Sequence, residues 1–351
     1  MRLLIGGSSS FLFHLKEFSD TLNSLGVESK LVFDSDYADG FPSRKIKNWF
    51  QTKKKFNKLI DEFKPDAIFV DRQRHFGINA LKANIPLFVL LRGHYWSEIN
   101  WNKKTIYKSL PKRIALSQWD KLGKEIFNGA TAILPICKYL EKITNKFVPG
   151  KSTNVFSEGV DASKWYQVKG MNLKHPCIGL LQRANWWGKT SEMLILKKVL
   201  EKMPGVNFYW AGDGPLRERV LSELDKYDNF HWLGNLQYPD KVREYLSEID
   251  VYALISGMDL APLSLKEAQL MRKPVIATDV GGNSEMMING KTGFLVEKGN
   301  DEQLIEKLRL LLENVDMTKK MGNEGRKFIE DTFNWEVGTK LFIKTLESYL
   351  K

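Results

Sequence analysis

Two acidic residues stand eight positions apart in the segment 251–296, VYALISGMDLAPLSLKEAQLMRKPVIATDVGGNSEMMINGKTGFLV. Asp259 comes first, and Glu267 is expected to open a helix that ends near Arg272. A carboxylate can accept hydrogen bonds from two vicinal hydroxyls, such as those of a ribose or a hexose. The N-terminus of a helix adds free N–H groups that bind phosphate. The segment therefore predicts a site for a phosphorylated sugar.

For a single Glu near the start of a helix, the simpler interpretation is that it complements the helix dipole. The rest of the segment favours binding. A buried strand is expected at Val275–Thr278, followed by a glycine turn at Gly281-Gly282, a second turn at 289–293 and an apolar run at 294–296. This order of elements resembles the donor half-site of retaining GT-B glycosyltransferases of family 4.

The resemblance implies an α/β fold of the GT-B type, with two Rossmann-like domains facing across a cleft. Residues 1–163 would form an acceptor-side domain, onto which a C-terminal helix at 336–351 packs back. Residues 164–335 would bind the nucleotide-sugar donor. The implied activity is the retaining transfer of a hexose to a glycan or lipid-linked acceptor in cell-surface polysaccharide or glycoconjugate synthesis. In this reaction no side chain needs to act as a covalent nucleophile.

Two cations follow the strand expected at 178–181. A transferase of this kind must stabilise the negative charge that grows on the departing diphosphate. Arg183 and Lys189 have the spacing of the Arg and Lys that clamp the diphosphate in the resembling family. An Arg can bind phosphate in bidentate fashion, and a Lys adds a point charge. The alternative is a pair of surface cations without a role in binding.

The resemblance also places further residues near the donor. Asn235 follows Leu233-Gly234, where the nucleobase of the donor usually rests. Where the family usually has Glu-Gly-Phe-Gly, this chain has Asp259 followed by Leu-Ala-Pro, and Pro262 has no N–H to offer. The complete set expected to bind the UDP- or GDP-sugar consists of Gly7, Arg183, Lys189, Asn235, Asp259, Leu263, Ser264 and Glu267.

The first half supplies two more candidates. Gly7 lies in a Gly-Gly-Ser turn after the first strand, where backbone amides approach a phosphate or sugar closely. His94 follows a buried strand, where the family often has a functional histidine, although a lone His is more often structural. The expected catalytic set is Asp259, His94, Arg183 and Lys189. Asp34-Ser35-Asp36 is similar to a metal-binding Asp-x-Asp, but we expect a loop there, and neither a metal nor another cofactor.

Apolar strands alternate with helical periods along the chain, a pattern typical of parallel sheets covered on both faces. In the first half, strands are expected at 3–5, 29–33, 67–70, 87–91 and 132–134, and a last strand and turn at 154–161. A second series of strands and helices follows. Two α/β domains of similar size are also what the length of 351 residues predicts.

Nearly all of the net charge of +11 falls before residue 166. Two basic stretches interleaved with aromatic residues, 44–58 and 101–124, hold most of it. Such stretches are typical of segments that lie on anionic lipid. They could also bind nucleic acid or a polyanionic glycan, or form a solvated face with the aromatic rings turned to the core. From the lopsided charge and its interleaved aromatic residues we expect an anionic membrane surface as a partner, and not nucleic acid.

The longest clean apolar run, 85–91, is far shorter than the roughly 20 residues that a transmembrane helix needs. The apolar stretch in the start MRLLIGGSSS is too short for a signal peptide. Cys137 and Cys177 do not have the spacing of metal ligands. We expect a cytoplasmic protein, with peripheral association at the inner membrane face as a further hypothesis. Two other functions stay open: another GT-B enzyme such as a sugar-nucleotide epimerase, and a non-catalytic polyanion-binding protein.

Overall fold

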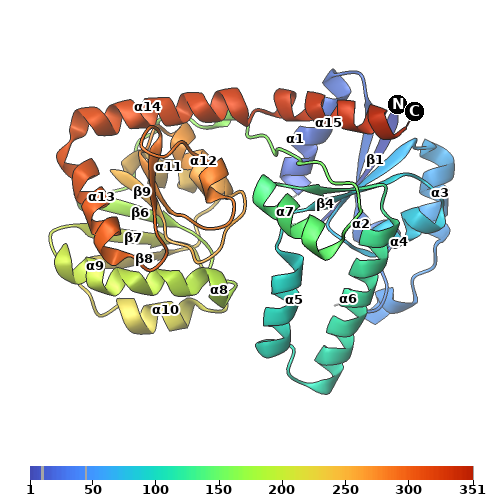
Figure 1. The fold of residues 1–351 in the computed structure, drawn as a ribbon, viewed down its shortest axis with the longest axis horizontal. Coiled ribbons are helices and arrows are strands. Elements are labelled where there is room, and N and C mark those ends of the chain that lie inside the picture. The colour runs from blue at the N-terminus through green and yellow to red at the C-terminus, as the bar shows by residue number, and fades with distance from the viewer. Residues whose placement is uncertain (9–11, 44–45, 351) are drawn as a thin grey trace. The chain divides into compact units, whose positions relative to one another are not determined.

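The computed structural model describes residues 1–8, 12–43 and 46–350, which divide into two compact α/β units (Figure 1). Unit 1 comprises residues 1–159 and 335–351, and unit 2 comprises residues 160–334. These boundaries differ by one to four residues from the expected ones. Val160 belongs to unit 2 because its N–H donates to the Phe333 carbonyl, and Trp335 belongs to unit 1 because its ring stacks on Phe18.

Unit 1 contains a parallel sheet of five strands in the order β2-β1-β3-β4-β5. Strands β3 and β4 are buried along their whole length, as expected for runs of apolar residues covered on both faces. The segment 154–161 is not a strand, so that expectation is wrong: past one isolated bridge at Thr153, only scattered backbone bonds join it to β5. The strands are β1 (Arg2–Gly7), β2 (Glu28–Phe33), β3 (Ala67–Asp71), β4 (Leu87–Leu91) and β5 (Ala132–Pro135).

An aromatic cluster joins the first and last helices of unit 1 to its sheet. The Phe18 ring on α1 contacts Phe69 of β3, Phe156, and both Trp335 and Phe342 of α15. The C-terminal helix is therefore part of the core of unit 1. The helices are α1 (Leu12–Ser24), α2 (Asp34–Tyr37), η2 (Ile46–Phe50), α3 (Lys54–Phe63), α4 (His75–Lys82), α5 (Tyr95–Lys104), α6 (Leu110–Gly129), α7 (Lys138–Phe147) and α15 (Trp335–Tyr349).

Unit 2 contains a parallel sheet of six strands in the order β11-β10-β9-β6-β7-β8. The chain builds outward from β6 in one direction and then from β9 in the other, so the strand order reverses between these two neighbours. In sheets of this kind ligands bind beyond the carboxyl ends of the strands at such a reversal. The strands are β6 (Cys177–Leu181), β7 (Asn207–Ala211), β8 (Phe230–Gly234), β9 (Val251–Leu254), β10 (Val275–Thr278) and β11 (Gly293–Val296).

Alternate residues of each central strand enter two separate hydrophobic clusters. Phe208 and Trp210 of β7 belong to one cluster, and Tyr209 and Ala211 belong to the other. Because side chains alternate along a strand, each cluster covers one face of the sheet. The helices that complete these layers are η3 (Ala162–Lys164), α8 (Trp187–Thr190), η4 (Ser191–Ile195), α9 (Leu196–Lys202), α10 (Arg217–Leu224), α11 (Asp240–Glu248), α12 (Leu263–Leu270), η5 (Asn283–Glu285), α13 (Asp301–Glu313) and α14 (Val315–Thr332).

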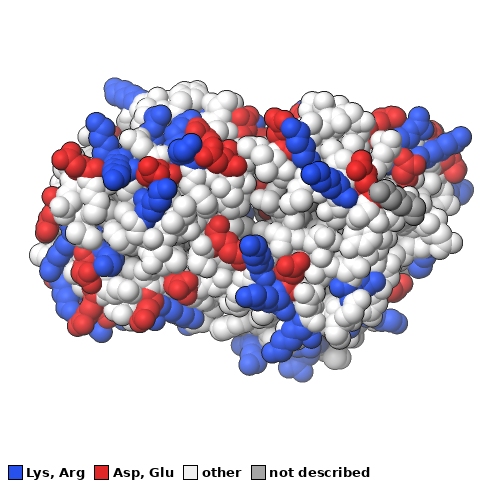
Figure 2. All heavy atoms as spheres, turned by 45° about the horizontal axis from the view of Figure 1, so that its top comes forward, with Lys and Arg blue, Asp and Glu red and all other residues white. Residues whose placement is uncertain are grey.

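Acidic and basic side chains are intermingled over the visible face of unit 2 (Figure 2), in keeping with its 24 Lys and Arg and 25 Asp and Glu. None of the helices within the described ranges is both long and apolar enough to cross a membrane.

A charged clamp closes the amino end of the second sheet. His175 lies 2.9 Å from Glu248 through Nε2 and 2.9 Å from Asp250 through Nδ1. These hydrogen bonds, first that of Glu248 and then that of Asp250, raise the pKa of His175. The Asp250 carboxylate also accepts the Cys177 N–H at 2.7 Å, so the clamp fixes the start of β6.

We predict that His175→Gln lowers the melting temperature more at pH 6 than at pH 9. A raised pKa in the folded state gives stability that is fully present below the unfolded value of about 6.5 and is lost as the pH rises through the folded value. The side chain is 43% exposed, so the loss should be modest. Thermal denaturation at the two pH values measures it.

His231→Gln is the matched control, since burial, followed by the charge of Lys174, lowers the pKa of His231. This variant should therefore gain stability relative to the parent as the pH falls. If His175→Gln lowers the melting temperature equally at both pH values, the clamp is not charged.

Candidate functional site

Lys189 and Asp259 meet at the carboxyl ends of β6 and β9, where the strand order of unit 2 reverses. Lys189 belongs to α8, which follows β6, and Asp259 belongs to the loop after β9. The Lys189 ammonium donates to Asp259 Oδ2 in an ion pair. Their side chains are only 26% and 14% exposed, so the pair is partly shielded from water. The structure thus brings together two residues that lie 70 positions apart in the sequence.

Backbone contacts hold the Asp259 loop against its neighbours. The Gly257 N–H donates to the Lys189 carbonyl at 2.9 Å, and the Gly282 N–H donates to the Asp259 carbonyl at 3.0 Å. Gly281 has a φ of +59°, and a Cβ there would lie 1.8 Å from the Asp259 carbonyl oxygen. Only glycine fits this approach. The Gly281-Gly282 turn therefore fixes the position of Asp259.

Glu267 does not open its helix, so that prediction is wrong. Helix α12 begins at Leu263, directly after Pro262 in extended conformation, and Glu267 lies one turn into the helix. Pro262 is the N-cap residue, and its ψ of 120° lies outside the helical range. The free amides at this helix start therefore belong to Leu263 and Ser264. The Ser264 hydroxyl also accepts a hydrogen bond from the Tyr252 hydroxyl at 2.7 Å.

The Glu267 carboxyl is almost completely buried, with 4% of the residue exposed. Burial raises its pKa to about 7, against the opposing effects of a hydrogen bond with the Tyr238 side chain and of the nearby Lys266 charge. Near neutral pH the group is therefore divided between its acid and its carboxylate. A ligand that donates hydroxyl hydrogen bonds would stabilise the carboxylate.

Arg183 and Asn235 lie at the same edge of the sheet. Arg183 follows β6, and Asn235 follows Gly234 at the end of β8. Both residues are exposed, and within the described chain Arg183 forms no ion pair or hydrogen bond through its side chain. The carboxyl edge of the second sheet thus carries two cations, one carboxylate and one amide, from the segments that follow the three strands β6, β8 and β9.

In unit 1 the structure gives Gly7 and His94 structural roles. A Cβ at Gly7 would lie 2.4 Å from Leu15 Cδ1, so the close packing of α1 requires a glycine. His94 caps α5, since its Nδ1 accepts the Ser97 N–H at 3.2 Å. Burial lowers the pKa of His94, which keeps the ring neutral. A contact of either residue with a donor sugar stays a prediction.

The sequence reasoning missed a buried charge network in unit 1. Arg92 binds Asp71 at 2.9 Å and Glu158 at 2.6 Å, and all three side chains are at most 5% exposed. Asp71 also accepts the Ser8 hydroxyl at 3.1 Å. A signal for this network was present in the sequence. Asp71 is the last residue of one buried apolar strand, and Arg92 directly follows another. The network lies at the carboxyl ends of β3 and β4.

The expected loop at Asp34-Ser35-Asp36 is instead the short helix α2, so that expectation is corrected. Asp34 follows β2 directly, and its carboxyl accepts a hydrogen bond from the Ser35 backbone. The residue is buried, and this burial raises its pKa to about 6. Its nearest ion-pair partner is Arg74 at 3.6 Å.

Among the described residues, one group of three has the side chains and spacing for a metal ion: His175, Cys177 and Asp250. It lies at the amino end of the second sheet, opposite the edge that carries Lys189 and Asp259. Burial raises the pKa of Cys177 to about 12, which keeps it a thiol, and His175 and Asp250 already bond each other. We interpret the group as structural, and a reaction without metal stays a prediction.

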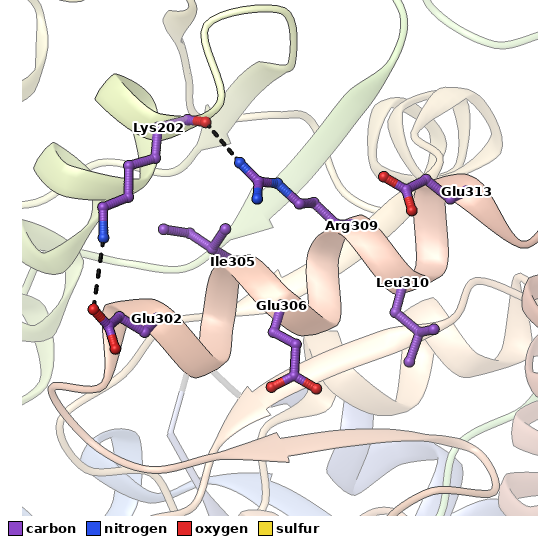
Figure 3. Close-up of a pocket in the computed structure, with 7 residues that line it drawn as sticks. All are labelled: Lys202, Glu302, Ile305, Glu306, Arg309, Leu310 and Glu313. Atoms are coloured by element: carbon purple, nitrogen blue, oxygen red, sulfur yellow. Dashed lines mark hydrogen bonds and ion pairs between the residues drawn. The ribbon is translucent and has the colours of Figure 1, made fainter.

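A surface groove of about 460 Å³ runs along α13 beside the end of α9 (Figure 3). Lys202 reaches Glu302 at 3.8 Å, and Arg309 donates to the Lys202 carbonyl at 3.1 Å across it. None of the predicted site residues lines this groove. It is a seam between two packed helices on the flank of unit 2.

Comparisons with known proteins give one family match and several partial relatives. Residues 164–328 match the family described as glycosyl transferases group 1. An uncharacterised glycosyltransferase of Methanocaldococcus jannaschii is 33% identical over 37% of this chain and 37% of its own length. Trehalose synthase of Thermococcus litoralis is 30% identical over 50% and 43%. A capsular polysaccharide biosynthesis glycosyltransferase of Staphylococcus aureus is 38% identical over 20% and 19%. The matches thus span less than half of each relative.

Solved structures match nearly the whole chain. Sucrose-phosphate synthase from Thermosynechococcus elongatus superposes with a TM-score of 0.73 at 15% identity, over 99% of this chain and 98% of that one. Anabaena HepE in complex with UDP-glucose gives a TM-score of 0.70 at 16% identity, over 99% and 100%. The two parallel-sheet units therefore have the GT-B fold, and residues 164–328, within the second unit, match the family of group 1 glycosyl transferases.

Proposed function

We propose that this chain is a retaining glycosyltransferase, similar to family 4, that moves a hexose from a nucleotide sugar to a glycan or lipid-linked acceptor. The observation that carries the proposal is the Lys189–Asp259 ion pair at the carboxyl ends of β6 and β9. It pairs a phosphate-binding cation with a hydroxyl-binding carboxylate at the point where sheets of this type bind ligands. The family match covers both residues.

A UDP- or GDP-sugar is the donor that fits this site. HepE, which shares the fold, has been solved with UDP-glucose bound, and this supports a nucleotide sugar here. A role in cell-surface polysaccharide or glycoconjugate synthesis is supported by the similarity of a short segment to the S. aureus capsular enzyme.

Each charged residue has a place in this reaction. Arg183, which is exposed and without a side-chain partner in the described chain, would bind the diphosphate through two N–H groups. Lys189 would exchange part of its contact with Asp259 for the diphosphate and stabilise the charge that develops on it. Asp259 would then accept a hydroxyl of the donor sugar. Leu263 and Ser264 would offer amides at the start of α12, and Glu267 would accept the ribose hydroxyls.

The bond changes need no covalent intermediate with the protein. The acceptor hydroxyl attacks the anomeric carbon on the face from which the diphosphate leaves, and a new glycosidic bond replaces the sugar–phosphate bond. A leaving phosphate oxygen takes the proton of the attacking hydroxyl. The residues of unit 2 act on the charge of the leaving group, which is where such catalysis gains most.

We predict that Lys189→Ala weakens nucleoside diphosphate binding by tenfold or more, because a hydrogen bond to a charged group contributes about 1.5–3 kcal/mol. A thermal-shift panel of UDP, GDP, ADP and CMP would identify the base, since a ligand at 100 times its Kd adds about 2.7 kcal/mol of stability. Lys197→Ala is the matched control: Lys197 also pairs with an acid in unit 2, Glu223, at 2.7 Å. A panel in which no nucleotide stabilises the parent protein would contradict the donor site and favour a non-catalytic protein.

A second variant separates the sugar from the nucleotide. Asp259→Asn keeps the shape of the side chain, removes its charge and releases Lys189 from its ion pair. We expect turnover to fall about tenfold or more, through the loss of a charged hydrogen bond to the sugar, while affinity for the nucleoside diphosphate is kept or increases. Steady-state transfer assays and calorimetry measure the two quantities. Full turnover in this variant would mean that another residue holds the sugar.

We predict that the affinity for the nucleoside diphosphate rises with pH through about 7, where Glu267 ionises. Only the carboxylate accepts two hydroxyl hydrogen bonds, and the protonated acid competes as a donor. In Glu267→Gln this pH dependence should disappear and the affinity should stay low. Calorimetry between pH 6 and 8 tests the prediction, and an unchanged slope in the variant would place the ribose elsewhere.

A further inference from the structure

Helices α5 and α6 form a hairpin that projects from the rest of unit 1 and turns at residues 105–109 (Figure 1). Its base is firmly packed. The Tyr95 hydroxyl donates to Asp120 Oδ1 at 3.1 Å, and the Trp96 ring stacks on Phe147 with 4.6 Å between centroids. A Cβ at Gly123 would lie 2.5 Å from the Tyr95 hydroxyl, so the two helices approach as closely as a glycine allows. The base of the hairpin is therefore an integral part of the packed fold of unit 1.

The tip of the hairpin exposes three large aliphatic side chains. Ile106 is 52% exposed, Leu110 is 72% exposed and Ile114 is 48% exposed. Leu110 and Ile114 lie one turn apart at the start of α6, so they share a face of the helix. Single exposed aliphatic residues are common, but a group of three on one projecting element is typical of a binding surface.

The same tip carries an unbalanced positive charge. No acidic residue occurs between Glu98 and Asp120. Within the described chain none of the five cations of the tip forms an ion pair, and all are exposed. Figure 2 shows blue side chains gathered at the lower end of unit 1, where the hairpin of Figure 1 ends. These cations are Lys103, Lys104, Lys108, Lys112 and Arg113.

The other basic stretch has a different structure. Helix α3 turns Phe56, Leu59 and Phe63 into the core and leaves its lysines on the solvent face, where Lys58 lies 3.7 Å from Glu62. Helix α3 covers only residues 54–58 of that stretch, and before it η2 leaves Ile46 67% exposed and Phe50 82% exposed. Arg44 and Lys45, at its start, lie outside the described residues.

We propose that the α5–α6 tip is a docking surface for anionic lipid membranes. Ile106, Leu110 and Ile114 enter the headgroup region, and the five cations around them contact anionic headgroups, which is how peripheral proteins combine apolar burial with charge attraction. A soluble nucleic acid or polyanionic glycan would use the cations but would leave the aliphatic side chains in water. The proposal does not rest on the proposed function, because the tip belongs to unit 1 and the donor site to unit 2.

Sedimentation with vesicles tests the proposal. The full chain should bind vesicles of phosphatidylcholine with phosphatidylglycerol and not vesicles of phosphatidylcholine alone. The double variant Leu110→Asn/Ile114→Asn and the double variant Lys103→Ser/Lys104→Ser should each lose binding on the order of tenfold or more. Leu341→Asn, a substitution of a residue 54% exposed on α15 of the same unit, should bind like the parent. Equal binding to both kinds of vesicle would overturn the proposal.

A label at position 110 tests insertion directly. Cys137 and Cys177 are both buried, so an environment-sensitive fluorophore will react with Leu110→Cys in the folded protein. Its emission should shift to the blue on anionic vesicles, whereas the same label on Leu341→Cys should not respond. Unchanged emission at position 110 would overturn the proposal, as would a loss of vesicle binding in Phe50→Asn but not in Leu110→Asn/Ile114→Asn.

Two further measurements separate the outcomes. Binding of heparin or RNA that competes fully with vesicles and is unaffected by Leu110→Asn/Ile114→Asn would assign the tip to a soluble polyanion and overturn the proposal. The nucleoside diphosphate thermal shift should be the same in all hairpin variants and in the parent. A failure of the donor site would therefore leave the vesicle result unchanged.

Discussion

The neighbouring positions of β6 and β9 are the constraint on which the site depends. These parallel strands pair through Ile178 with Val251 and Gly179 with Tyr252, although about 70 residues separate them in the chain. Because both run in the same direction, the segments that follow them emerge at the same edge. A cation after one strand and an acid after the other are thereby brought into contact. A hairpin connection between the same strands would have placed them at opposite edges.

Glycines then turn this proximity into a fixed geometry. The Asp259 loop approaches the backbone of two neighbours, at Gly257 beside Gly188 and at Gly281 beside the Asp259 carbonyl, so closely that any Cβ would clash. This loop lacks the glycines that the resembling family has directly after the acid, and Pro262 ends it instead. The rigidity of the site therefore comes from the residues around the loop more than from the loop itself. The carboxylate of Asp259 accepts the Leu260 N–H at 3.2 Å and pairs with Lys189.

The sequence predicted those parts of the structure whose physics is local. Val275–Thr278 and Leu87–Leu91 are short apolar runs bounded by polar or turn residues, and the strands have these limits. The start of α12 was misplaced because Glu267 was given weight as a first-turn acid, whereas Pro262 sets the boundary. The helices α5 and α6 were not predicted because lysines and exposed aliphatic residues at their junction interrupt the apolar period. The Arg92 network was missed because a buried ion triad depends on contacts between segments that only the fold brings together.

The charges of unit 1 illustrate the difference between cations that folding needs and cations that it does not. Arg92 is buried, and the cost of removing its charge from water is offset by two carboxylates and a fixed hydrogen-bond geometry. The folded state therefore requires the two carboxylates as much as it requires Arg92. At the tip of the α5–α6 hairpin no such requirement exists, since the cations are exposed and lack acidic partners in the described chain. Repulsion among like charges, together with the exposed aliphatic side chains beside them, makes the free tip less stable than a neutral, polar tip would be. A surface that costs stability in the isolated chain recovers it in contact with something that is both anionic and apolar, and an anionic lipid bilayer offers charged headgroups above an apolar acyl region.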